Sequence, residues 1–179
     1  LTFAIAVDAN SPVRTLADLT AALKKKQGNG FYGTGNNTGL VAAEIYKDQS
    51  GLATTHVNYV ASGTALQDLT SGNIDFISYD ASFLIGHARA GRIRILATTS
   101  AQRAIGTPDI PTFAESGIAG VDLTPWWGVV VPAGTPKPIV DQLEKWFNQI
   151  SADDETRNFL VPLGAEPFQG SGELMARLL

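Results

Sequence analysis

A chain of 179 residues with 44% hydrophobic and 17% charged residues has the composition of a globular protein rather than a disordered one. Its net charge of −4 and its isoelectric point near 5.1 lack the basic surplus that indicates binding to nucleic acid or to an anionic membrane. The absence of cysteine excludes a disulfide framework and a zinc site held by thiolates.

The first hundred residues alternate short apolar runs with amphipathic stretches, a pattern typical of β-strands joined by helices. The predicted strands cover residues 1–7, 31–32, 56–59, 74–77 and 93–98. The predicted helices cover residues 16–26, 40–50, 64–71 and 83–90. Strands that alternate with helices imply right-handed crossovers, so we expect a mostly parallel sheet.

Residues 108–131 carry the start and stop signals of a helix and then of a strand. Thr112 followed by Glu115 is a capping box, in which each side chain satisfies a backbone N–H of the first turn. Gly117 stands where a left-handed residue ends a helix. Trp127–Val131 is apolar and β-branched, which predicts a buried strand.

A longer helix is predicted over residues 136–150. Thr135 is a suitable N-cap, and Pro136 suits the first helical position, where its missing N–H costs nothing. Five apolar side chains recur on one face of this helix, namely Ile139, Leu143, Trp146, Phe147 and Ile150. This stripe predicts packing against a core rather than an aromatic ligand site.

The motifs PDxPTxxExG at residues 108–117 and WGxxxPxGTP at residues 127–136 follow each other closely. Together they resemble the Bug-type solute-binding proteins of tripartite tricarboxylate transporters. The resemblance continues upstream in residues 90–103 and 71–75, and it covers essentially the whole chain.

The resemblance implies an α/β fold with a periplasmic-binding-protein-like (type II) lobe and a mostly parallel sheet, plus the C-terminal part of a second α/β lobe. It implies a division into residues 1–9 (hinge strand from the first lobe), 10–103 (second lobe), 104–120 (return connection) and 121–179 (C-terminal part of the first lobe). The family pattern that precedes Leu1 is absent, so we expect a fragment or a natural truncation. Apolar faces left uncovered would favour a homodimer.

Ligands of open parallel sheets bind at the carboxyl ends of strands, where helices begin. Three such junctions are rich in glycine and hydroxyl residues. The predicted ligand-binding residues are Thr34, Gly35, Asn36, Asn37, Thr38, Tyr59, Ser62, Gly63, Thr64, Tyr79 and Asp80. Free N–H groups at the helix starts favour an anion, and glycine lets a carboxylate approach the backbone. From the sequence alone, each junction also fits a simple capped helix.

The chain departs from the family at these junctions. The histidine that the family places just inside the second helix falls on Leu40, so a histidine contact is lost. Tyr59 matches a family tyrosine, but residues 60–62 replace the lysine and glycine that follow it. The family often has an aspartate where this chain has Tyr79, with Asp80 one residue later. Because successive side chains of a strand point to opposite faces, Asp80 is expected to point away from the cleft.

The sequence offers little for catalysis. His56 and His87 are the available histidine bases, and neither lies beside a nucleophile motif. The loop at residues 33–39 is not a nucleotide-hydrolase loop, because no lysine and hydroxyl residue follow its last glycine. We predict no enzymatic activity, no cofactor and no metal.

The resemblance therefore implies a periplasmic solute-binding protein that captures a small carboxylate and delivers it by lobe closure to the membrane components of a tripartite tricarboxylate-type secondary transporter. A ligand-sensing regulatory domain of the same fold and a small α/β enzyme are the alternatives. Because the family site needs loops from both lobes, we expect the 179-residue chain by itself to bind ligand weakly or not at all.

Overall fold

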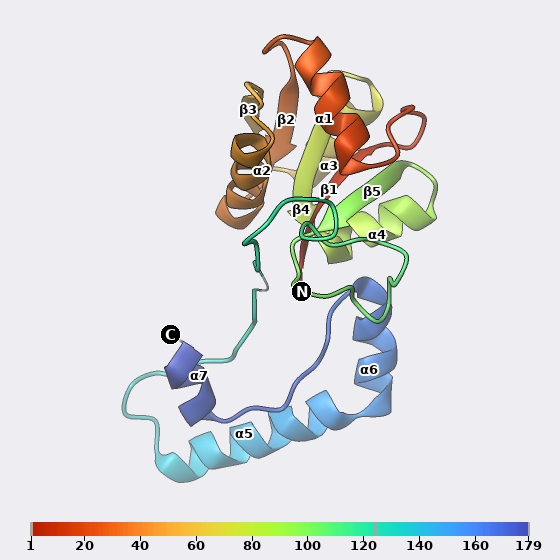
Figure 1. The fold of residues 1–179 in the computed structure, drawn as a ribbon. Helices are drawn as coiled ribbons and strands as arrows, with labels where there is room; N and C mark the ends of the chain where they lie inside the picture. The colour runs from red at the N-terminus through yellow and green to blue at the C-terminus, as the bar shows by residue number, and fades with distance from the viewer. Residues whose placement is uncertain (1, 124, 179) are drawn as a thin grey trace.

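Residues 2–123 and 125–178 are described by a computed structural model, in which residues 3–98 build a five-stranded sheet with its helices (Figure 1). The strands are β1 (Phe3–Asp8), β2 (Phe31–Thr34), β3 (Thr55–Asn58), β4 (Phe76–Asp80) and β5 (Ile93–Thr98). They lie side by side in the order β3-β2-β4-β1-β5. β2 is parallel to β3 and β4, whereas β1 is antiparallel to β4 and β5. The sheet is therefore mostly parallel, with the first strand reversed between its neighbours.

Helices cover both faces of this sheet. They are α1 (Leu16–Lys25), α2 (Asn37–Gln49), α3 (Ser62–Thr70) and α4 (Ala81–Arg89). Along β1, Ile5 and Val7 pack with α1 and α2 in one buried cluster, while Ala4 and Ala6 pack with α3 and α4 in another. This alternation follows from the two-residue period of a strand, and it places β1 at the centre of the core.

The predicted alternation of strands and helices is confirmed, and only element ends differ. The cap predicted at Thr15 forms, because Asp18 N donates to Thr15 Oγ1 at 3.1 Å. α3 and α4 each begin two residues earlier than predicted. β4 begins at Phe76 rather than Ile74 and runs to Asp80, because the residues before it form a turn and Asp80 both ends the strand and caps α4.

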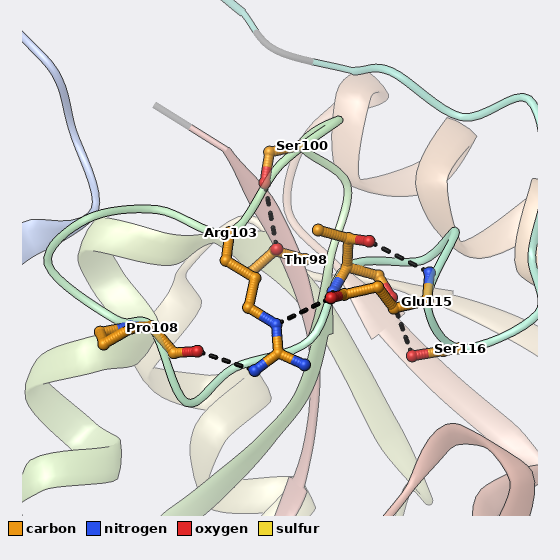
Figure 2. A network of polar contacts seen from close by, with 7 residues as sticks. Thr98, Ser100, Arg103, Pro108, Glu115 and Ser116 are labelled. Carbon is orange, nitrogen blue, oxygen red and sulfur yellow. Dashed lines mark hydrogen bonds and ion pairs between the residues drawn. The ribbon is translucent and has the colours of Figure 1, made fainter.

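Polar contacts around Arg103 hold together the irregular segment that follows β5 and that includes the return connection, residues 104–120 (Figure 2). Arg103 Nε donates to both carboxylate oxygens of Glu115, at 3.0 and 2.9 Å. Arg103 Nη1 also donates to Pro108 O at 2.8 Å. The planar guanidinium of Arg103 therefore joins Pro108 and Glu115 within this irregular segment.

The predicted capping box in the return connection is confirmed. Glu115 N donates to Thr112 Oγ1 at 3.1 Å, and Thr112 N donates to Glu115 Oε2 at 2.8 Å. Gly117 has the predicted left-handed conformation, with φ of +88°. The helix predicted after the box is nevertheless wrong, because residues 113–117 form only turns. The left-handed Gly117 follows Thr112 too closely for a helix to propagate.

The C-terminal part, residues 125–178, lies largely apart from the sheet (Figure 1). Its elements are α5 (Lys137–Ala152), α6 (Asp154–Leu160), the 3-10 turn η1 (Val161–Leu163) and α7 (Gly172–Leu178). α5 contains no buried residue, so the predicted core packing of its apolar stripe is wrong. A cavity of about 330 Å³ instead lies between α5, α7 and residues 126–131.

The buried strand predicted at Trp127–Val131 is also wrong. These residues have no strand partner within the described part of the chain, and the Trp127 side chain is 76% exposed. A strand needs a neighbour to satisfy its backbone groups and to cover its side chains. The predicted Thr135 cap fails as well, since Thr135 Oγ1 donates to Pro132 O and Pro136 occupies the N-cap of α5.

The two parts of the molecule meet where η1 lies against α4. Arg89 Nη2 donates to Pro162 O at 2.9 Å, which joins the end of α4 to η1. Gly106 lies so close to Val161 that a side chain at position 106 would meet the Val161 carbonyl. Within residues 2–123 and 125–178, no helix is long and apolar enough to cross a membrane.

Candidate functional site

The three predicted junctions lie on one edge of the sheet. The ends of β2, β3 and β4 are in register, because Thr34 pairs with Asn58 on one side and with Ser78 on the other. Parallel strands in register place their carboxyl ends, and the helix starts that follow, side by side. The segments 34–38, 59–64 and 79–80 therefore border a common region, as the sequence predicts.

The first junction is the start of α2. Asn36 is the N-cap, and its side-chain oxygen accepts from Gly39 N at 2.8 Å. Gly39 is required here, because a Cβ at this position would lie 2.5 Å from the carbonyl oxygen of Ser78. The helix start therefore lies directly against β4. The N–H groups of Asn37 and Thr38 have no intrahelical carbonyl to which they can donate. Gly35, Asn36 and Asn37 are exposed.

Thr34 does not present its side chain to this edge. Its hydroxyl is buried on the α2 side of the sheet and lies 2.7 Å from His56 Nε2. The His56 ring in turn lies 5.1 Å from the Tyr32 ring, measured between centroids. Thr34 contributes backbone instead, since its carbonyl accepts from Tyr59 N at 2.9 Å and so joins the first junction to the second.

The second junction is the start of α3, where the N-cap is Ala61. Alanine has no side-chain acceptor, and the structure gives this helix start no side-chain cap. Thr64 N donates to Ala61 O at 3.1 Å, whereas Ser62 and Gly63 provide the first helical N–H groups. Ala61, Gly63 and Thr64 are exposed, so the positive end of the α3 dipole opens to the sheet edge.

Tyr59 turns away from the edge and packs beneath α3. Its hydroxyl donates to Asp68 Oδ2 at 2.7 Å, and its ring lies against Gly33, where a Cβ would be 2.8 Å from it. Burial, followed by the hydrogen bond to Asp68, raises the pKa of Tyr59 to about 12. The Tyr59 hydroxyl is therefore committed to an internal contact.

The third junction joins β4 to α4. Asp80 is the N-cap of α4, and its Oδ1 accepts from Phe83 N at 2.9 Å and from the Ser82 hydroxyl at 2.5 Å. Tyr79 points to the opposite side of the strand, where its ring lies 5.5 Å from the Phe83 ring and its hydroxyl lies beside Gly35. The junction thus brings Tyr79 to the first junction and engages Asp80 in capping.

The electrostatic character of the edge comes from the backbone. The segments 33–39, 59–64 and 79–82 contain no lysine, arginine or histidine, and Asp80 is their only carboxylate. Two helix starts therefore supply the attraction for an anion without a charged side chain. Among the described residues, no group of three or more histidine, cysteine or acidic side chains is arranged to hold a metal ion.

Neither histidine has the surroundings of a catalytic base. His56 contacts the Thr34 hydroxyl, but that hydroxyl belongs to a side chain that is only 1% exposed, which leaves a substrate no approach. His87 packs edge-on against Phe83, with 4.6 Å between ring centroids. Burial and then the charge of Arg92 lower the pKa of His87.

The residues predicted from the sequence do not include a polar cluster that lies at the end of β5. Thr99 follows β5 at the same edge, and its Oγ1 lies 3.2 Å from Thr2 Oγ1. The same oxygen accepts from Phe3 N at 3.1 Å and donates to Leu123 O at 2.9 Å. Thr99 thus ties the first strand to the return connection, and the hydroxyl run of residues 98–100 after a strand is the signal for it in the sequence.

Relatives of this chain are found in several bacteria. A UPF0065 protein of Bordetella bronchiseptica is 32% identical over 181 residues, which cover 98% of this chain and 52% of the relative. Protein BugT of Bordetella pertussis is 29% identical over 124 residues, which cover 69% of this chain and 38% of the relative. The chain spans about half the length of the curated relatives that match most of it.

Solved structures show the same fold. R. palustris Rpa4515 with adipate has a TM-score of 0.91 at 31% identity, and the match covers 99% of this chain and 60% of that one. The periplasmic binding protein BugD has a TM-score of 0.82 at 25% identity, covering 94% of this chain and 57% of that one. These likenesses confirm the predicted periplasmic-binding-protein-like α/β fold.

A family model described as the tripartite tricarboxylate transporter family receptor matches residues 1–179, which is the whole chain. The match agrees with the mostly parallel sheet, with the Bug proteins among the relatives and with the motifs at residues 108–136. This chain therefore belongs to the Bug-type receptor family of the tripartite tricarboxylate transporters.

Proposed function

We propose that this chain captures a small carboxylate in the periplasm, at the sheet edge where α2 and α3 begin, for delivery to the membrane components of a secondary transporter. The observation that carries the proposal is the pair of helix starts at neighbouring strand ends, one capped by the Asn36 side chain and the other, after Ala61, without a side-chain cap. Their free N–H groups belong to segments that contain no basic side chain. Such backbone donors hold anions, carboxylates among them.

In this proposal the ligand-binding residues make different contributions. Asn37, Thr38, Ser62 and Gly63 act through backbone N–H groups. Gly35 lets the ligand approach the backbone, and Thr64 is an exposed hydroxyl beside the α3 start. Thr34, Asn36, Tyr59 and Asp80 shape the junctions through the internal contacts described above. The solved relative Rpa4515, a complex with adipate, supports a carboxylate as the class of ligand.

We also propose the lobe division expected from the sequence. Residues 10–103 would form one lobe, with residues 1–9 and 104–120 as the two connections and residues 121–179 as part of the other lobe. The sheet built from residues 3–98 and the separate position of α5 to α7 support this division. The Thr99 contacts support a hinge, because they join Thr2 and Phe3, in the first connection, to Leu123, just after the second connection.

The proposal is tested by removing single backbone donors. Proline is tolerated at the first helical position, where it deletes only an N–H. Asn37→Pro and Ser62→Pro make this change at the α2 and α3 starts, and the residues before them, Asn36 and Ala61, have the extended backbone that precedes proline. Asp154→Pro is the matched control at the start of α6, away from the edge.

Adipate is titrated into the 179-residue chain, and amide shifts are followed by NMR, which detects weak binding. We expect shifts at Asn37, Thr38, Ser62 and Gly63, and affinities lowered roughly tenfold in the two site variants but not in Asp154→Pro. If adipate, malate and citrate all leave these amides unshifted, the chain is not a carboxylate receptor at this edge.

We further propose that the 179-residue chain forms a homodimer through its C-terminal part. The half-exposed apolar side chains of α5 and the exposed Trp127 support this, because apolar patches of such extent are usually covered by a partner. Light scattering at increasing concentration tests it. A constant monomer mass would contradict the homodimer without bearing on ligand binding.

A further inference from the structure

The hydroxyl of Tyr79 is buried without a hydrogen-bond partner among the described residues. The side chain is 3% exposed, and its ring packs in the cluster between the sheet and α3 and α4. A buried hydroxyl that makes no hydrogen bond lowers stability, and phenylalanine would fill the same space without that cost. The stability of the fold therefore does not explain why this position carries a hydroxyl.

The position of this hydroxyl suggests the reason. It lies against Gly35, where a Cβ would be 2.8 Å from the hydroxyl oxygen. Gly35 is exposed and immediately precedes the cap of α2. The hydroxyl is thus separated from the candidate site by one residue without a side chain, and glycine is the residue type whose backbone adjusts most easily. A small movement of Gly35 would let a bound ligand reach the phenol.

The neighbours of Tyr79 define what it can recognise. Burial, together with the adjacent Asp80, raises the pKa of Tyr79 to about 12, so the phenol keeps its proton at neutral pH and can donate to an anion. Asp80 caps α4 through Oδ1 and, as the next residue of the strand, lies on the opposite side from Tyr79. The junctions therefore offer donors for a carboxylate beside Tyr79 and no carboxylate there for an ammonium group.

We propose that Tyr79 is a specificity-determining residue of this site, whose hydroxyl donates to a carboxylate oxygen of a ligand bound over Gly35. It selects acids that carry no ammonium group beside that carboxylate. This inference rests on the proposed carboxylate-binding function and names its ligand class. The selected class comprises plain and hydroxylated carboxylates, as distinct from amino acids.

The test compares two buried hydroxyls. Thr54 Oγ1 is also buried without a partner among the described residues, but it lies at the opposite edge of the sheet, where its Cγ2 contacts Gly30. Tyr79→Phe and Thr54→Val each remove such a hydroxyl with little change of shape. Both variants should unfold at the same temperature as the wild type or higher, because neither loses a hydrogen bond.

Only Tyr79→Phe should weaken binding. In the amide titration of the 179-residue chain, we expect the affinity for adipate to fall about tenfold in Tyr79→Phe and to stay unchanged in Thr54→Val. The wild type should prefer adipate to 2-aminoadipate, which differs by one ammonium group, and Tyr79→Asp should reverse that preference.

The outcomes separate this inference from the function on which it rests. A wild type that binds adipate while Tyr79→Phe binds it equally well overturns the role of Tyr79 and leaves the receptor proposal standing. A wild type that binds 2-aminoadipate as tightly as adipate overturns the selectivity. A wild type that binds no carboxylate overturns the proposed function and this inference with it.

Discussion

The sheet-bearing part of the molecule and its C-terminal part carry equally apolar sequences but bury them differently. In residues 2–123, side chains from every strand except β3 and from α1 to α4 are buried in two clusters. In residues 125–178, α5 has no buried side chain, although five apolar residues line one face. The segment 127–131, which has the composition of a core strand, is exposed.

The difference shows what an apolar pattern means. Periodicity identifies the face of a helix or strand that gains from burial, but burial itself requires a partner surface. β1 has such partners on both edges, in β4 and β5. Residues 127–131 have no strand beside them within the described residues, so the same kind of sequence stays extended and unpaired.

The largest effect is expected from matched phenylalanine truncations in the two parts. Phe76 is fully buried and stacks on Tyr32 with 5.0 Å between ring centroids, so Phe76→Ala should lower the free energy of unfolding by about 3–5 kcal/mol. Phe159, in α6, is 68% exposed, and Phe159→Ala should cost less than about 1 kcal/mol. Urea unfolding followed by circular dichroism measures both, and equal losses would refute the contrast.

A second test measures how closely the sheet-bearing part is packed where its helices begin. Gly39→Ala places a Cβ 2.5 Å from the Ser78 carbonyl, and backbone cannot move aside as a flexible side chain does. We expect a loss of about 1–3 kcal/mol in the free energy of unfolding. Gly86→Ala, inside α4 with no atom within 4 Å of the new Cβ, should instead gain about 0.5–1 kcal/mol. A Gly39→Ala variant as stable as the wild type in thermal unfolding would contradict the close approach.

Most of the fold in the sheet-bearing part could be predicted, because its signals are local. The capping residue Thr15, the apolar face of α1 and the β5 strand need only neighbouring residues to be recognised. The failures at Trp127–Val131 and along α5 concern non-local partners. Whether Trp127–Val131 pairs as a strand depends on another segment lying beside it, which no spacing within those five residues reveals.

The candidate site shows the same contrast between features set by local signals and features set by non-local partners. The convergence of three junctions follows from parallel strands in register, which alternation of strands and helices predicts. The direction in which each side chain points does not follow from this alternation. Tyr59 bonds Asp68 and Thr34 bonds His56, contacts that join residues 9 and 22 positions apart. The role of Thr99 depends on Thr2 and Leu123, which only the folded chain brings together.

The link between the two parts gives a third, smaller effect. Thr99→Val removes the hydroxyl that contacts Thr2 Oγ1, Phe3 N and Leu123 O, and we expect a loss of about 1–2 kcal/mol. Leu123 N donates to Thr99 O at 3.2 Å, so its hydrogen exchange should accelerate most. Thr55→Val, at an exposed position of β3, is the matched control. Unchanged protection of the Leu123 amide in Thr99→Val would mean that the hydroxyl does not hold the connection.

The smallest effect concerns pH and the return connection that joins the two parts. The hydrogen bond from Arg103, and then that from Thr112 N, lower the pKa of Glu115 from its ordinary value of 4.5. A carboxyl whose pKa is lower in the folded state adds stability above its ordinary pKa, and this stability is lost as the pH falls through the folded pKa.

The stability difference between the wild type and Glu115→Gln should therefore be largest near neutral pH and should shrink below about pH 4.5. Because both side chains are nearly half exposed, the effect should be small and should weaken with added salt. Thermal unfolding of the wild type, Glu115→Gln and Glu166→Gln between about pH 7 and about pH 3 measures it. Glu166→Gln makes the same charge change outside the Arg103 network, so a pH profile shared by the two variants would show that the network does not stabilise the connection.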